Sequence, residues 1–88
     1  MTDQKKVIYP QNFDLSLIIV AEIPVEEAKQ HISRALTESQ TVHSFVSVRS
    51  SSKGNYLSYT YNVDVENQTH LEKTYSALKN IPGLKFAL

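Results

Sequence analysis

The sequence predicts an α+β domain with a ferredoxin-like fold, a βαββαβ split sandwich whose four-stranded antiparallel sheet carries two helices on one face. Three observations predict it. Two runs of alternating apolar residues flank a Gly-Asn turn, two segments repeat apolar residues at helical spacing, and a strand-like run lies near each end of the chain. Right-handed crossovers then place the first and third strands in the centre of the sheet and the second and fourth at its edges.

The first strand is predicted over residues 13–22. Tyr9-Pro10 precedes it, and a proline favours extended backbone in the residue before it. The odd-numbered positions of the strand form one apolar face, while Ile18 and Val20 make the other face partly apolar. Because both faces carry apolar residues, the strand is expected in the centre of the sheet.

The first helix is predicted to begin at Val25. Pro24 breaks the strand and suits the first turn of a helix, and the acidic residues Glu26 and Glu27 suit the positive end of its dipole. The polar segment 39–41 ends the helix. Apolar residues recur at the spacing of an amphipathic helix, at Val25, Ala28, Ile32, Ala35 and Leu36.

A β-hairpin is predicted around the hydroxyl-rich turn Ser50–Asn55, with strands over residues 43–50 and 56–65. Val46 and Val48 alternate before the turn. Gly54 is expected to adopt a positive φ, which glycine tolerates best. After the turn the apolar alternation continues through Leu57, Tyr59, Tyr61, Val63 and Val65.

The second helix is predicted to start at Asn67 or Thr69, either of which can cap it. Pro82-Gly83 stops it. Its apolar stripe comprises Leu71, Thr74, Tyr75 and Leu78, with Ile81 beyond them. A short closing strand follows over residues 84–88, with Leu84, Phe86 and Leu88 alternating.

Composition limits the function classes. The chain has 88 residues, which suits one domain over residues 9–88 after a flexible tail at 1–8. Lys plus Arg and Asp plus Glu are nine each, and this balance argues against general nucleic-acid binding. The absence of cysteine excludes disulfides and Cys-based metal sites. A cytoplasmic location is expected, because neither a signal peptide nor a membrane-spanning run is recognisable.

Three activities found on ferredoxin-like folds do not suit these residues. A metal chaperone needs a Cys-x-x-Cys loop. An acylphosphatase-like enzyme needs a glycine-rich loop with an arginine, and residues 22–25 carry neither glycine nor a cation. An RNA-recognition motif needs aromatic residues on the open face of the sheet, whereas alternation assigns Tyr59 and Tyr61 to the buried face.

No enzyme activity, cofactor or metal site is predicted. His31, His43 and His70 fall on different elements without the spacing of a metal site. The pair Glu26-Glu27 is explained by the preference of acidic residues for a helix start. No Ser, His and Asp arrangement has a recognisable local signature.

Two surface features are candidate binding sites. The turn can offer an anion hydroxyls, an ammonium and backbone amides, although the same composition is typical of ordinary hairpin turns. Its candidate residues are Ser51, Ser52, Lys53, Gly54 and Asn55. The second feature is the face without helices, where Ile18, Val20 and Tyr56 lie among small polar residues and form a candidate contact patch, although scattered apolar residues are also normal on surfaces.

The turn 51–56, Ser-Ser-Lys-Gly-Asn-Tyr, followed by an alternating strand, resembles that of the YbeD-like family of small bacterial proteins. The segment 9–13, Tyr-Pro-Gln-Asn-Phe, is similar to the family's entry to its first strand, and the final helix and strand also match. This resemblance implies a fold close to the ACT regulatory domain and assigns no catalytic residue. Some members are encoded beside lipoate-synthesis enzymes, which suggests a regulatory role. Amino-acid-binding ACT domains usually have a glycine after the first strand, where this chain has Glu22-Ile23-Pro24.

Together these features predict a non-enzymatic regulatory or protein-interaction module with a link to lipoate metabolism implied by the resemblance. It is expected to dock its open sheet face or an edge strand onto a second copy of itself or another protein. One alternative is a sensor of an anionic metabolite bound at the turn Ser50–Asn55. Another is an RNA-binding domain, which the alternation disfavours.

Overall fold

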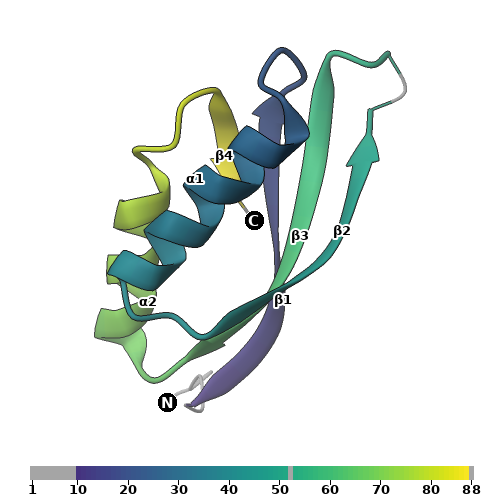
Figure 1. Cartoon of the computed structure of the whole chain (residues 1–88). Coiled ribbons are helices and arrows are strands. Elements are labelled where there is room, and N and C mark those ends of the chain that lie inside the picture. The colour runs from purple at the N-terminus through teal and green to yellow at the C-terminus, as the bar shows by residue number, and fades with distance from the viewer. Residues whose placement is uncertain (1–9, 52, 88) are drawn as a thin grey trace, which may run out of the picture.

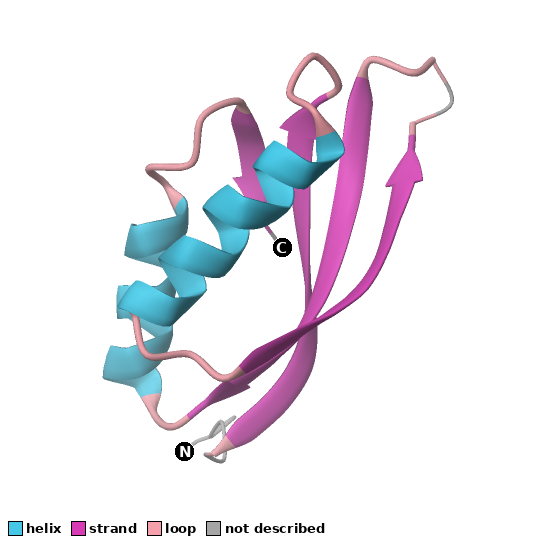
Figure 2. Cartoon of the chain, in the orientation of Figure 1, coloured by secondary structure: helices cyan, strands magenta, loops and turns pink. Residues whose placement is uncertain are grey.

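Four antiparallel strands form one sheet in the order β2-β3-β1-β4, with two helices packed on one face (Figure 1). The elements are β1 (Gln11–Val20), α1 (Val25–Glu38), β2 (His43–Ser50), β3 (Tyr56–Val65), α2 (Gln68–Leu78) and β4 (Leu84–Ala87). This computed structural model describes residues 10–51 and 53–87, so the tail predicted over 1–8 lies outside them, as do Ser52 and Leu88. The predicted element order and the placement of central and edge strands are confirmed. In the described part, both helices lie on the same side of the sheet (Figure 2).

The bounds of β1 differ from the predicted residues 13–22 by two residues at each end. At the start, Asn12 pairs with Asp64, and its side-chain amide donates to the Asp64 carboxylate at 2.7 Å. At the end, the amide of Ile23 donates to the carbonyl of Val20 at 3.3 Å, so the chain turns earlier. Polar side chains that hydrogen-bond across strands therefore extend β1 beyond its apolar run.

The core lies between the helices and the sheet, where predicted alternation and helical spacing place apolar side chains. Tyr59 and Tyr61 are 0% and 3% exposed, which confirms that they belong to the buried face. Burial raises the pKa of the Tyr59 phenol, and it raises the pKa of Tyr61 to about 12 together with the nearby Tyr59 and Glu26. The other buried apolar residues are Leu15, Leu17, Ile19, Ala28, Ile32, Ala35, Leu36, Val63, Val65, Leu78 and Ile81.

β2 contains a bulge that apolar alternation did not reveal. Phe45 pairs with Tyr61 and Ser47 pairs with Thr60, so Val46 is an extra residue without a partner in β3. Val46 is 50% exposed, whereas Val48 packs against the core. The predicted continuation of the alternation through Val46 is therefore wrong, because the bulge moves its side chain out of register.

The helix starts are only partly as predicted. Asn67 caps α2, because its side-chain oxygen accepts a hydrogen bond from the amide of His70 at 2.8 Å. This decides between the candidates Asn67 and Thr69. Pro24 lies immediately before α1 rather than in its first turn, and two acidic residues occupy that turn as predicted.

Gln40 follows the end of α1 with a φ of 59°, a left-handed conformation that favours glycine. Its amide donates to the carbonyl of Thr37 at 2.9 Å, and the amide of Thr41 donates to the carbonyl of Leu36 at 2.7 Å. These two bonds form a Schellman motif. Because the Gln40 side chain is exposed, we expect Gln40→Gly to raise the free energy of unfolding by about 0.5 kcal/mol or more, as measured by urea denaturation.

The matched control is Gln30→Gly at an exposed position inside α1, which should lower the free energy of unfolding by about 1 kcal/mol. If both substitutions destabilise the protein equally, the left-handed conformation of Gln40 carries no strain.

A buried polar cluster, defined as Ser39, Thr41, Thr74 and His70, joins the end of α1 to the start of α2. The Thr41 hydroxyl lies 2.9 Å from the Ser39 hydroxyl, 2.9 Å from the Thr74 hydroxyl and 3.2 Å from His70 Nε2. His70 Nδ1 accepts a hydrogen bond from the Glu66 amide at 3.0 Å. The ring proton therefore lies on Nε2, which donates to the Ser39 carbonyl at 3.0 Å. The cluster thus satisfies polar groups that the core buries.

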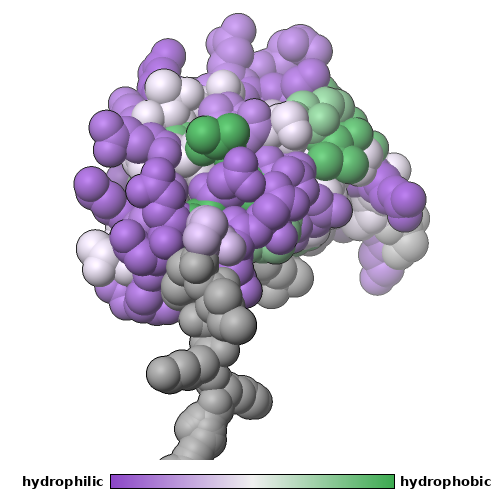
Figure 3. Space-filling view, turned by 90° about the horizontal axis from the view of Figure 1, so that it is seen from below, coloured by the Kyte–Doolittle hydropathy of each residue, from purple (hydrophilic) through white to green (hydrophobic). Residues whose placement is uncertain are grey.

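The end of the molecule where β1 begins is mainly hydrophilic, with small separate apolar patches (Figure 3). On the helix-free face, the side-chain amide of Asn62 donates to Asp14 at 3.0 Å and to Asn12 at 3.0 Å. A ladder of amides and carboxylates therefore covers this end of the sheet. Within residues 10–51 and 53–87, no helix has the length and hydropathy needed to cross a membrane.

Candidate interaction site on the open face of the sheet

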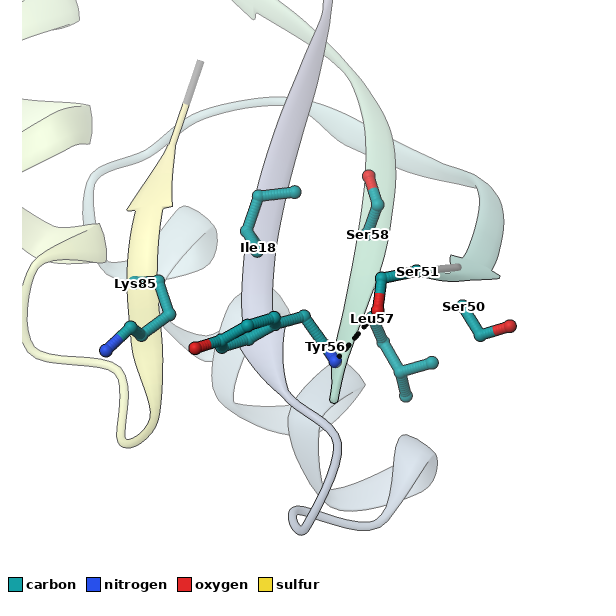
Figure 4. Close-up of a pocket in the computed structure, with 7 residues that line it drawn as sticks. All are labelled: Ile18, Ser50, Ser51, Tyr56, Leu57, Ser58 and Lys85. Atoms are coloured by element: carbon teal, nitrogen blue, oxygen red, sulfur yellow. Dashed lines mark hydrogen bonds between the residues drawn. The ribbon is translucent and has the colours of Figure 1, made fainter. Parts of the chain in front are cut away.

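A hollow of about 370 Å³ lies beside the β2–β3 turn, on the open face, meaning the side of the sheet opposite the helices. Strands β1 to β4 and the residue after β2 all contribute to it (Figure 4). The residues that line this hollow are Ile18, Ser50, Ser51, Tyr56, Leu57, Ser58 and Lys85.

Strand register brings the apolar part of the hollow together. Ile18 pairs with Ser58, and Val20 pairs with Tyr56, so these side chains share the open face, as alternation predicted. Tyr56 is 37% exposed. Its ring extends across β1 toward β4 (Figure 4), where the Lys85 ammonium lies 6.0 Å from the ring centroid. Ile18 and Tyr56 thus meet in one site.

Lys85 reaches the hollow from an irregular edge strand. Ile18 pairs with Phe86 and Ile19 pairs with Leu84, so Lys85 is an extra residue between consecutive partners. The regular alternation predicted for β4 is broken there. Sequence reasoning missed Lys85 because a one-residue register shift leaves no mark in composition. In the described residues its ammonium has no carboxylate within ion-pair distance.

The predicted anion-binding turn separates into residues inside and outside the hollow. Ser51 lines the hollow and closes the turn, since its amide donates to the Tyr56 carbonyl at 2.8 Å and its hydroxyl accepts from the Tyr56 amide at 3.3 Å. Gly54 has a φ of 75°, which confirms the predicted conformation. Lys53, Gly54 and Asn55 are exposed and do not line the hollow, and Ser52 is outside the described residues.

Backbone hydrogen bonds join three loops beside the hollow. The amide of Ala21, after β1, donates to the carbonyl of Asn55 in the β2–β3 turn at 2.9 Å. The amide of Val20 donates to the carbonyl of Gly83, before β4, at 3.0 Å. Val20 packs beside Gly83 and does not line the hollow, so the predicted contact patch retains Ile18 and Tyr56.

The histidines make structural contacts. His43 Nδ1 lies 2.8 Å from the Thr41 carbonyl and its Nε2 lies 3.2 Å from the Ser33 hydroxyl, while His31 pairs with Glu27 at 3.4 Å. In the part of the chain that the structure describes, no group of three His, Asp or Glu side chains is suited to hold a metal ion.

Comparison with known sequences gives one consistent result. The family model described as "Protein of unknown function (DUF493)" matches residues 4–88. The chain is also similar to UPF0250 proteins from Neisseria meningitidis serogroups A, B and C. Each is 33% identical over 92 residues, an alignment that covers 100% of this chain and 100% of the relative.

Two solved structures share the fold. The solution structure of protein HP0495 from H. pylori has a TM-score of 0.69 at 15% sequence identity, and the match covers 97% of this chain and 88% of that one. The solution structure of the C-terminal domain of the MgtC protein from Mycobacterium tuberculosis has a TM-score of 0.57 at 17% identity, covering 90% and 84%. At these identities the likeness concerns the fold alone.

Proposed function

This chain belongs to the DUF493 family of proteins of unknown function, of which the YbeD-like proteins are part, and on that premise we propose that it is a non-enzymatic module that binds a partner protein through its open face. The observation that supports this function is the hollow, where Ile18 and the 37% exposed Tyr56 form an apolar surface. Exposed aromatic and aliphatic groups on an otherwise polar face are typical of protein contacts.

The rest of the open face suits docking of a flat surface. Small polar side chains from the central strands, including Ser16 and Thr60, lie on the same face next to the hollow, and no helix covers this face in the described part. A polar rim around an apolar centre is the usual anatomy of a transient protein interface. The partner is a second copy of the chain or another protein.

The resemblance to the YbeD-like family extends this proposal to regulation in lipoate metabolism, in the cytoplasm. It supports a binding role, since the resemblance brings no catalytic residue with it. The RNA-binding alternative has less support, because Tyr59 and Tyr61 lie in the core and cannot stack on bases.

Ile18→Asp is expected to weaken partner binding strongly, because it places a charge in the apolar centre of the interface. Tagged wild-type and variant proteins are used for affinity capture from native lysate, with quantitative mass spectrometry, and self-association is measured by sedimentation. We expect at least one protein, or the chain itself, to be retained by wild type and reduced about tenfold or more by Ile18→Asp.

Val42→Asp is the matched control, since it also replaces an exposed aliphatic residue, 70% exposed, at a position away from the hollow. It should retain the partner at the wild-type level. A monomeric protein that captures nothing, or a partner lost equally from both variants, would count against docking through the open face.

A further inference from the structure

We propose that the hollow is a binding site for a small amphipathic carboxylate, with the Lys85 ammonium as counter-ion and with Ile18 and Tyr56 as the apolar walls. The ligand class is a monocarboxylic acid with a short aliphatic or aromatic group. This inference does not rest on docking of a partner protein, and it moves the anion-binding group from the predicted Lys53 to Lys85.

The unpaired charge of Lys85 is the reason why the ligand should be an anion. It is exposed at the rim of the hollow, it has no carboxylate partner in the described residues, and its ammonium lies 6.0 Å from the Tyr56 ring centroid. Among the described residues, the only ion pair is the distant contact between His31 and Glu27. An anion at the hollow therefore gains an attraction to Lys85 without breaking an existing salt bridge.

Apolar contact comes from the walls of the hollow. Its volume of about 370 Å³ is within the usual range of small-molecule sites. Ile18 offers aliphatic surface, and the Tyr56 ring offers a flat face between β1 and β4 (Figure 4). A ligand without an apolar group would leave this surface exposed to water, so inorganic anions fit the hollow poorly.

Hydroxyl groups supply the remaining donors. Ser58 lines the hollow opposite Ile18, and its hydroxyl makes no hydrogen bond with another described residue. The Ser51 hydroxyl accepts from the Tyr56 amide and keeps its own proton available. One ammonium and neutral hydroxyls match a single negative charge. A phosphate dianion normally requires several cations or a set of convergent amides.

The test is an NMR titration of ¹⁵N-labelled full-length protein with 3-phenylpropionate and hexanoate, each compared with its neutral amide. We expect saturable shifts at the amides of Ile18, Tyr56 and Lys85, with the acids binding about fivefold or more tightly than the amides. Acids and amides of equal affinity, shifts confined to another surface, or no binding at millimolar concentration would each overturn the proposal.

Lys85→Met removes the charge and keeps most of the stem, and Lys79→Met is the matched control at an exposed lysine that does not line the hollow. Lys85→Met should weaken acid binding about fivefold and leave amide binding unchanged, whereas Lys79→Met should change neither. An equal loss in both variants would overturn the proposal. If Lys85→Met does not fold, the comparison of acid with amide on the wild-type protein still decides it.

Failure of this test is distinguishable from failure of partner docking. Carboxylate binding is read from the purified protein, while docking is read from capture with Ile18→Asp and Val42→Asp. A protein that captures its partner and binds no carboxylate would refute only the ligand site.

Discussion

Gly83→Ala is expected to lower the free energy of unfolding by about 3 kcal/mol, because two costs combine. Gly83 has a φ of 76°, a conformation in which a Cβ atom is strained. The new Cβ would also lie 2.8 Å from Cγ2 of Val20 and still nearer to Cδ1 of Ile23, whose side chain packs against the core. Urea denaturation followed by circular dichroism measures the loss.

Gly54→Ala separates the two costs. Gly54 has nearly the same φ, 75°, but a Cβ there would meet nothing within 4 Å. It should therefore lose only the conformational part, about 1 kcal/mol. Equal destabilisation by the two substitutions would mean that the β4 entry relaxes freely and that Val20 and Ile23 impose no steric limit on Gly83.

Thr41→Val is expected to lower the free energy of unfolding by about 2 kcal/mol. Valine matches threonine in shape, so the change removes the hydroxyl without opening a cavity. That hydroxyl lies within hydrogen-bond distance of Ser39, Thr74 and His70, and Thr41 itself is 3% exposed. The Thr74 hydroxyl donates to the His70 carbonyl at 2.8 Å and keeps that bond, but the buried polar cluster loses its central member.

Thr37→Val is the control, because Thr37 is exposed on α1 and the same chemical change there should cost less than about 0.5 kcal/mol. In wild type, ¹⁵N chemical shifts should identify His70 as the Nε2–H tautomer. A Thr41→Val protein as stable as the control, or a His70 ring with its proton on Nδ1, would contradict the hydrogen-bond assignment of the cluster.

Most of the fold followed from patterns that one sequence contains. Alternation assigned Tyr59 and Tyr61 to the core, and the spacing of apolar residues located both helices, because burial of one face is the main constraint on each element. The two bulges could not be found in this way. Val46 and Lys85 are ordinary strand residues, and only the partner strand determines that they are extra.

The candidate site, like the fold, was predictable where strand pairing is regular and not where a bulge intervenes. Alternation along regular β1 and β3 brought Ile18 and Tyr56 to one face. The sequence does not reveal Lys85, because a bulge brings it to the hollow, and it favours Lys53 because that residue is adjacent to the serines of the turn. Hydrogen bonds of the buried polar cluster were missed for a similar reason, since His70 meets Ser39 only after the helices pack.

The bonds from Ala21 to Asn55 and from Val20 to Gly83 fix the lengths of three connections that are far apart in the chain. A deletion or duplication of one residue in any of them would withdraw an amide from its acceptor and displace the neighbouring strand ends. Changes in chain length, peptide tags and new termini are therefore expected to be poorly tolerated within these three connections. Evolution and engineering face the same geometric restriction at this end of the molecule.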